Sequence, residues 1–171
     1  MDTPSRPHNI VLAGFMGTGK STVGELIAET LGWRFIDSDQ LIVVLEDMPI
    51  KDIFAEKGEA YFRQVESRVA AELAEMRKIV VATGGGMMVN ADNRAAMGLR
   101  GLLVCLNATP DAIEQRIGGD TDRPLLKGDW RALLESRRDA YAALPYQVDT
   151  TGKTPEQVAQ EVVALWHRVS T

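Results

Sequence analysis

Residues 9–22 read Asn-Ile-Val-Leu-Ala-Gly-Phe-Met-Gly-Thr-Gly-Lys-Ser-Thr and decide the fold. The apolar run at residues 10–13 predicts a buried strand, and residues 14–21 match the pattern G-x-x-x-x-G-K-S/T in full. Apolar side chains then recur at helical spacing, which predicts a helix that begins at about Lys20. A glycine-rich loop between a strand and a helix turns backbone N–H groups toward phosphate oxygens. We therefore expect a nucleoside triphosphate site, the alternative being a glycine-rich turn that merely precedes a helix.

The loop predicts separate tasks for two of its side chains. Lys20 would reach the outer phosphates of ATP, and the Ser21 hydroxyl would be a ligand of Mg²⁺. The expected nucleotide contacts in this segment are Gly17, Thr18, Gly19, Lys20, Ser21 and Thr22.

The composition predicts an ordinary globular enzyme. The 171 residues suffice for one domain with a single large core, and 45% of them are hydrophobic and 25% charged. A formal charge of -5 without a basic patch argues against nucleic acid as a partner. We find no run of about 18 apolar residues and no signal peptide, so we expect a cytoplasmic chain that does not enter a membrane. The single cysteine, Cys105, lies in an apolar run and is expected in the core.

Strands and helices are expected to alternate along the chain. After the first strand, further strands are expected at residues 34–37, 79–82 and 102–106 and around Val148. Helices are expected at 39–45, 51–57, 59–76, 90–97 and 132–141, after Thr109 and after the Thr154-Pro155-Glu156-Gln157 capping box. This alternation predicts a three-layer α/β fold with a mainly parallel sheet. Ligands of such sheets bind beyond the carboxyl ends of the strands, where the phosphate loop, Asp37, Asp39 and residues 84–86 would meet.

Two acids and three glycines would equip this crevice. One acid of Asp37-Ser38-Asp39 could hold Mg²⁺ through water while the other accepts a proton from an attacking hydroxyl. The alternative is that Ser38 or Asp39 only caps the following helix. Glycines at 84–86 would let the backbone approach a ligand closely, the alternative being a plain loop.

Arginines could provide a second anion site. Arg63 and Glu66 lie three apart on a predicted helix, which is also the spacing of an ordinary solvated surface pair. Arg123 and Arg137 would likewise pass for surface charges. Together with Arg63 they could instead grip a carboxylate of the phosphate acceptor.

The combination resembles the shikimate kinase family, small P-loop kinases of aromatic amino-acid biosynthesis. The matching stretches are Gly-Phe-Met-Gly-Thr-Gly-Lys-Ser at 14–21, Phe-Ile-Asp-Ser-Asp at 35–39, Ile-Phe at 53–54, Gly-Glu-Ala-Tyr-Phe-Arg-Gln-Val-Glu at 58–66, Ala-Thr-Gly-Gly-Gly at 82–86, Asp-Arg-Pro-Leu-Leu at 122–126 and Arg-Arg-Asp-Ala-Tyr at 137–141. The likeness runs from about Asn9 to the C-terminus. Many kinases share the P-loop, but the seven stretches together are specific.

The resemblance implies one P-loop kinase domain over residues 1–171, with a five-stranded parallel sheet of nucleoside monophosphate kinase type. It also implies acceptor-binding helices at about 39–76 and a mobile lid at about 117–128. The implied reaction transfers the γ-phosphoryl group of ATP to the 3-hydroxyl of shikimate, with Mg²⁺ as cofactor. We expect a monomer whose partners are ATP and shikimate.

The resemblance also assigns residues by position. The acceptor would be held by Asp39, Arg63, Gly84, Gly85, Gly86 and Arg137, with the two arginines on its carboxylate and Asp39 on its hydroxyls. The implied catalytic residues are Lys20, Asp39 and Arg123, the last carried onto the phosphates by the lid. Asp37 would join Ser21 at the metal, and Arg116 and Pro155 would flank adenine.

Three residues depart from the family pattern, and two other functions stay open. Asp47 replaces a usual glycine, where aspartate still tolerates a positive φ. Val43 replaces a commonly acidic residue, and Asp139 a frequent proline. One alternative is a gluconate kinase, against which Arg63 and the triple glycine speak. The other is a nucleotide-binding regulator, which would have no use for a hydroxyl-activating acid.

Overall fold

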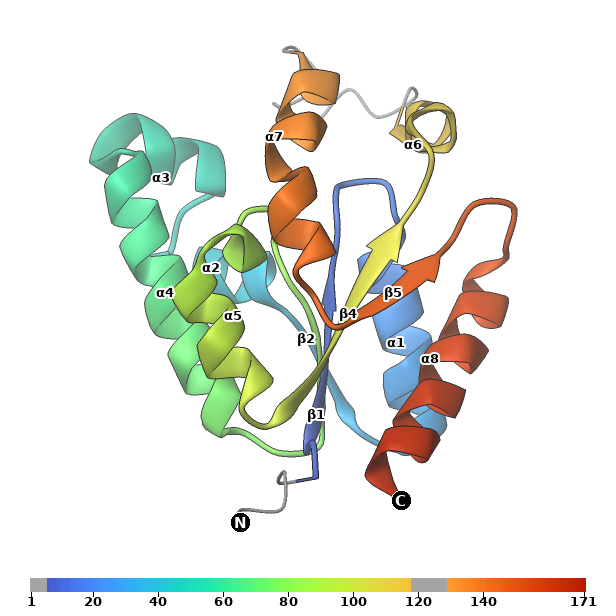
Figure 1. Cartoon of the computed structure of the whole chain (residues 1–171). Coiled ribbons are helices and arrows are strands. Elements are labelled where there is room, and N and C mark those ends of the chain that lie inside the picture. Colours follow the sequence, from blue (N-terminus) through green and yellow to red (C-terminus); the bar gives the residue numbers. More distant parts are fainter. Residues whose placement is uncertain (1–5, 118–128) are drawn as a thin grey trace.

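The strand β1 (Asn9–Ala13) lies in the middle of a five-stranded sheet in the computed structural model, which describes residues 6–117 and 129–171 (Figure 1). The order across the sheet is β2-β3-β1-β4-β5, and all four neighbouring pairs are parallel. The other strands are β2 (Arg34–Asp37), β3 (Ile79–Ala82), β4 (Gly101–Asn107) and β5 (Tyr146–Asp149). The carboxyl ends of the strands therefore meet at one edge, as the sequence predicts.

Helices cover both faces of the sheet. Ile10 and Leu12 of β1 join an apolar cluster with α1 (Lys20–Leu31) and α8 (Pro155–Ser170), whereas Val11 and Ala13 join a second cluster on the opposite face. The second cluster receives side chains from α2 (Ser38–Glu46), α3 (Ile50–Lys57), α4 (Glu59–Glu75), the 3₁₀ helix η1 (Met87–Val89), α5 (Ala91–Gly98), α6 (Pro110–Ile117) and α7 (Trp130–Ala142). The expected three-layer α/β fold is confirmed, and Cys105 is buried in the core.

Local sequence signals end and begin the helices where expected. Gly32 ends α1 in the left-handed conformation with φ 66°. Thr154 and Gln157 form the expected capping box, and Pro155 is the first residue of α8. Asp47 ends α2 with φ 52°, so this aspartate does adopt the conformation that glycine favours.

Glu46 joins the three helices α2, α3 and α4. Its Oε2 atom accepts hydrogen bonds from the Tyr61 hydroxyl of α4 at 2.7 Å and from Lys57 Nζ of α3 at 3.1 Å. Both bonds lower the pKa of the Glu46 carboxyl, which favours its charged form. These three helices span the residues expected to form the acceptor-binding helices, at about 39–76.

Two details differ from the sequence expectations. Ile117 does not open a polar loop but ends α6 and is 2% exposed, and residues 87–89 form a 3₁₀ turn that the sequence pattern does not predict. Residues 118–128 of the expected lid, which include Arg123, lie outside the described residues. No helix in the described part of the chain is both long and apolar enough to span a membrane.

Candidate functional site

The phosphate loop passes from β1 to α1 through glycines with positive φ. A side chain at Gly14 would collide with the backbone carbonyl of Leu106 at the end of β4, and its φ is 134°. Lys20 at the start of α1 folds back over the loop, where its Nζ donates to the carbonyl oxygens of Gly14 at 2.7 Å and Phe15 at 3.0 Å. The Thr18 hydroxyl, which is buried, also donates to the Phe15 carbonyl, at 2.7 Å. The loop is therefore braced by its own side chains.

Asp37 makes two separate sets of hydrogen bonds with its two carboxylate oxygens. Its Oδ1 accepts from the backbone N–H groups of Asp39 at 3.0 Å and Gln40 at 3.2 Å, so Asp37, and neither Ser38 nor Asp39, caps α2. Its Oδ2 accepts from the Ser21 hydroxyl at 3.0 Å. One carboxylate thus holds the helix and meets the serine of the phosphate loop.

Asp39 is a half-buried carboxyl among cations. Burial, and to a smaller extent the charge of Asp37, raises the pKa of Asp39 above its ordinary value. The charges of Lys20, Arg63 and Arg137 act in the opposite direction. The Asp39 carboxyl is therefore influenced by the lysine of the phosphate loop and by two arginines from other helices.

Residues 84–86 face three polar side chains at once. A methyl group added to any of these glycines would collide with one of them. The groups that it would meet are the Asp39 carboxylate at Gly84, the Arg137 guanidinium at Gly85 and the Arg63 guanidinium at Gly86. The triple glycine therefore lets three charged side chains from α2, α4 and α7 come together against one loop.

Arg63 is held by a buried acid. Its Nη1 donates to Glu66 Oε1 at 2.9 Å, and Glu66 is 2% exposed, so this is not the solvated surface pair of the alternative interpretation. Burial raises the pKa of Glu66, and the bond from Arg63 opposes that rise. At the surface Arg63 Nη2 lies 3.5 Å from Glu59.

Arg137 is held by α7 and by the phosphate loop. Its Cζ lies 5.8 Å from the centre of the Phe15 ring, within range of a cation–π contact. One turn further along the helix, the buried Tyr141 donates its hydroxyl proton to the Gly85 carbonyl at 2.6 Å. The sequence gives no signal for this bond, because an aromatic residue four positions after an arginine is typical of any amphipathic helix.

Arg116 reaches from α6 to the other side of the phosphate loop. Its guanidinium donates to the Gly17 carbonyl and to the hydroxyl and carbonyl oxygens of Thr150, each at 3.0 Å. Pro155 begins α8 a few residues after Thr150. Of the two residues expected near adenine, Arg116 therefore contacts the phosphate loop, and Pro155 follows the Arg116 partner Thr150 closely in the chain.

A model of the family described as shikimate kinase matches residues 16–166. The chain belongs to the shikimate kinase family. It is 44% identical over 170 residues to a shikimate kinase of Geobacter sulfurreducens, covering 96% of this chain and 94% of the relative. It is 43% identical over 159 residues to a shikimate kinase of Persephonella marina, covering 91% and 97%.

Solved structures agree with this family. A shikimate kinase from Acinetobacter baumannii in complex with shikimate has a TM-score of 0.88 at 36% identity, covering 95% of this chain and 94% of that chain. A gluconokinase from Sinorhizobium meliloti has a TM-score of 0.57 at 22% identity over 96% and 94%, which shows a shared fold alone. As a member of the shikimate kinase family, the chain is an ATP-dependent small-molecule kinase.

The donor atoms beside the phosphate loop suit magnesium. Among the described residues no group of three or more His, Cys, Asp or Glu side chains is placed to hold a metal by itself. Mg²⁺ usually takes only one or two protein ligands, the rest being water and phosphate oxygens. The Ser21 hydroxyl and the Asp37 carboxylate, 3.0 Å apart, fit that description.

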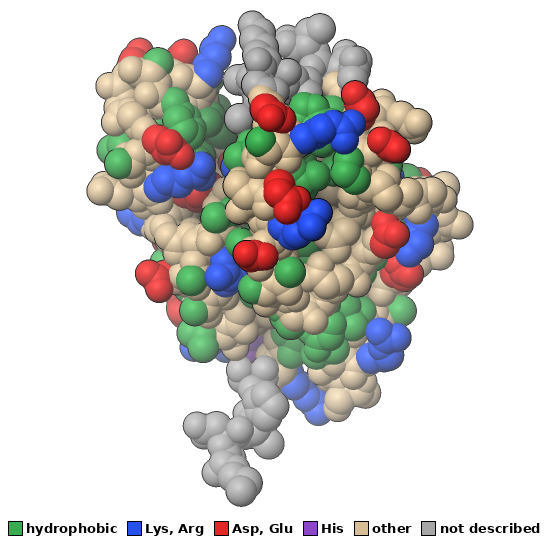
Figure 2. Space-filling view, turned by 45° about the horizontal axis from the view of Figure 1, so that its top comes forward, with side chains coloured by type: hydrophobic (Ala, Val, Ile, Leu, Met, Phe, Trp, Pro, Cys, Tyr) green, Lys and Arg blue, Asp and Glu red, His purple; other side chains and the backbone are tan. Residues whose placement is uncertain are grey.

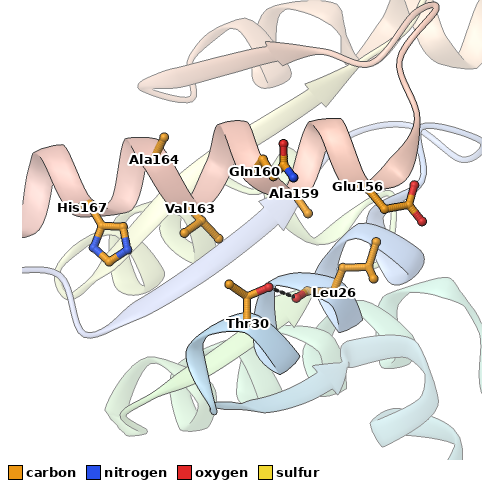
Figure 3. A pocket seen from close by; sticks show the side chains of 8 residues that line it. All are labelled: Leu26, Thr30, Glu156, Ala159, Gln160, Val163, Ala164 and His167. Carbon is orange, nitrogen blue, oxygen red and sulfur yellow. Dashed lines mark hydrogen bonds between the residues drawn. The ribbon is translucent and has the colours of Figure 1, made fainter.

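The molecule has a second hollow away from this crevice. A groove of about 390 Å³ lies between α1 and α8 (Figure 3). Its lining residues are Leu26, Thr30, Glu156, Ala159, Gln160, Val163, Ala164 and His167, and none of these is an expected site residue. The groove lacks the converging charged groups that lie against residues 84–86. Acidic and basic side chains are interspersed over the face shown in Figure 2.

Proposed function

We propose that this chain transfers the γ-phosphoryl group of ATP to the 3-hydroxyl of shikimate, which yields shikimate 3-phosphate and ADP. The observation that carries the proposal is the convergence of Asp39, Arg63 and Arg137 on the triple glycine, beside the lysine of the phosphate loop. A kinase site for a small carboxylic acid with several hydroxyls needs guanidinium groups to bind the carboxylate and a base to accept the proton of the attacking hydroxyl. The similar Acinetobacter enzyme has shikimate bound, which supports the choice of acceptor.

The two arginines have the chemistry to bind the acceptor's carboxylate. A guanidinium presents paired N–H donors that match two carboxylate oxygens, which an ammonium group does not. The Arg63 guanidinium is held by Glu66, and the Arg137 guanidinium lies over the Phe15 ring. The backbone of Gly84, Gly85 and Gly86 would lie against the acceptor ring.

Asp39 would act on the attacking hydroxyl. Its carboxylate must be ionised to accept the proton, which leaves the hydroxyl late in a loose transition state. Lys20 and the two arginines favour that ionised form against burial. Asp39 would therefore orient the hydroxyl and take its proton.

The phosphate loop would bind ATP through the residues from Gly17 to Thr22. Lys20 would exchange its two carbonyl partners for phosphate oxygens and stabilise charge on the transferred group. Ser21 and Asp37 would hold Mg²⁺, which supplies charge neutralisation at the phosphates when bound. We further infer that Arg116 and Pro155 flank adenine and that Arg123 serves catalysis from the lid, a role that lies outside the described residues.

The proposal includes a monomeric enzyme in the cytoplasm. The groups proposed to hold the acceptor and the phosphates converge within a single chain, which supports a monomer. The cytoplasm is where an enzyme that consumes ATP in a biosynthetic step finds this substrate.

The test is ADP release with shikimate, with gluconate and with no acceptor. We expect shikimate-dependent release of one ADP per shikimate 3-phosphate formed. ADP release that depends on gluconate instead would indicate a gluconate kinase, and ATP binding without ADP release would indicate a nucleotide-binding regulator.

Replacing Arg63 or Arg137 by lysine should raise the KM for shikimate far more than the KM for ATP, because the charge stays but the paired N–H donors are lost. Unchanged shikimate binding in both variants by calorimetry would refute this placement of the acceptor.

A further inference from the structure

Tyr141 lies where α7 meets the triple-glycine loop. The side chain is 5% exposed, and its hydroxyl donates to the carbonyl oxygen of Gly85 at 2.6 Å. Burial raises the pKa of this hydroxyl, and the charge of the nearby Arg137, which precedes it by one helical turn, opposes that rise. A methyl group at Gly85 would lie 2.7 Å from Arg137 Nη1 and 3.8 Å from the Tyr141 hydroxyl, so both groups meet at one point of the loop.

The hydrogen bonds at this point have a definite direction. Burial raises the pKa of the Tyr141 hydroxyl, so the hydroxyl keeps its proton and can donate it to the Gly85 carbonyl. Its lone pairs remain to accept from Arg137, which has only donors. The tyrosine can thus bridge a carbonyl of the loop and the Arg137 guanidinium, because its hydroxyl donates to the first and can accept from the second.

We propose that Tyr141 is a positioning residue for the phosphate acceptor, because its hydroxyl fixes the Arg137 guanidinium against the Gly85 carbonyl before the acceptor arrives. The proposal rests on the proposed function, in which Arg137 and Gly85 contact shikimate. An arginine side chain has several rotatable bonds, and an unheld guanidinium must be ordered at each binding event. Tyr141 also sets the distance between two groups of the acceptor site that come from α7 and from the end of β3.

The hydroxyl can be removed without changing the packing. Tyr141→Phe keeps every other atom, so the variant folds and the ring still fills its buried place. We expect the Kd for shikimate by calorimetry and the KM for shikimate each to rise about tenfold, as for one lost hydrogen bond to a charged group. The KM for ATP should stay within about twofold of wild type, because Lys20 and the phosphate loop do not contact this hydroxyl.

Tyr61→Phe is the matched control. It removes a hydroxyl that donates to Glu46 at 2.7 Å, so the chemical change and the length of the lost bond are nearly the same. Tyr61 joins α4 to α2 and is not assigned to the crevice. We expect this variant to lower the melting temperature while the shikimate Kd stays within about twofold of wild type.

A double-mutant cycle decides whether Tyr141 acts through Arg137. In an Arg137→Ala background, Tyr141→Phe should cause no further rise in the shikimate Kd. Additive effects, or equal rises in the ATP and shikimate constants, would overturn the proposal, because they indicate a merely structural role. A wild-type shikimate Kd in Tyr141→Phe would overturn it as well. Failure of the proposed function gives a different result, namely no shikimate-dependent turnover by the wild type or a wild-type shikimate Kd in Arg137→Ala.

Discussion

Replacing Gly85 by alanine tests how closely the loop and Arg137 must fit. The new Cβ would lie 2.7 Å from Arg137 Nη1, whereas ordinary contact begins at 3.4 Å, so the guanidinium must retreat by at least ~0.7 Å. Gly85 does not have a positive φ, so alanine adds no backbone strain. The atom that must move is the end of a flexible side chain, so the fold should tolerate the change.

The expected effect is therefore on acceptor binding and not on stability. A misplacement of about 1 Å can cost on the order of 10²-fold in rate, so a shift of this size should raise the KM for shikimate by about 10- to 100-fold. The KM for ATP and the melting temperature should barely change. The assay is coupled ADP release at varied shikimate, together with a thermal melt of each variant.

Gly152→Ala is the matched control for this prediction. Its added Cβ meets no atom within 4 Å, but its φ of 72° is one that alanine adopts only at a cost of about 1–2 kcal/mol. This control should lose stability and keep both KM values, the reverse of Gly85→Ala. A shikimate KM within about twofold of wild type in Gly85→Ala would refute the assigned contact between this loop, Arg137 and the acceptor.

Three further predictions concern the phosphate loop and the acid pair. Lys20→Met should lower kcat by at least about 10²-fold, as for other lost donors to transition-state charge, and near-normal turnover would exclude its role. Asp39→Asn should cut kcat by roughly 10²–10⁴-fold. The same change should raise the melting temperature at pH 7, because burial raises the pKa of Asp39 in the folded state. The protonated Asp39 carboxyl contributes fully to folding stability below the ordinary pKa of 3.8, and this contribution is lost as the pH rises through the raised pKa. Melts from pH 3 to pH 7 should therefore show the advantage of asparagine fading in acid, and wild-type kcat should fall over the same window as Asp39 is protonated; a pH-independent difference in melting temperature would contradict this. Asp37→Asn should raise the Mg²⁺ requirement, with rescue by excess metal, while melting changes little because asparagine caps helices as well as aspartate does; loss of shikimate binding instead would reverse the two assignments.

The fold could be predicted because its local signals agree with one another. The phosphate loop, the apolar strands and the capping box of Thr154 each act over a few neighbouring residues, and each has one structural meaning. Boundaries can shift by one or two positions, as at the start of α7, which begins at Trp130 and not at residue 132 because Asp129 caps it by accepting from the Ala132 N–H. Asp47 kept the turn expected of it because its conformational need is local.

The candidate site was only partly predictable, because its important contacts join residues far apart in the chain. The sequence predicted Ser38 or Asp39 as the possible cap of α2, whereas the cap is Asp37, whose other carboxylate oxygen bonds to Ser21 of the phosphate loop. The spacing of Arg63 and Glu66 is also that of an ordinary surface pair, but Glu66 is buried in the structure because α4 packs it into the interior. Tyr141 belongs to a stretch that matches the family, but its bond to Gly85 could not be predicted, since the two residues lie 56 positions apart.

The division of the crevice between elements has an evolutionary consequence. The groups proposed to face the acceptor come from α2, α4, α7 and the loop after β3, whereas those proposed to face the nucleotide come from the β1–α1 loop, α6 and α8. Substitutions on the first set can reshape the pocket for another small alcohol and leave the phosphate machinery as it is. Asp37 joins the two sets directly, because its carboxylate hydrogen-bonds to Ser21 of the phosphate loop and to the backbone of α2. Substitutions that change the preferred acceptor should therefore accumulate quickly in α2, α4 and α7 and slowly at Asp37.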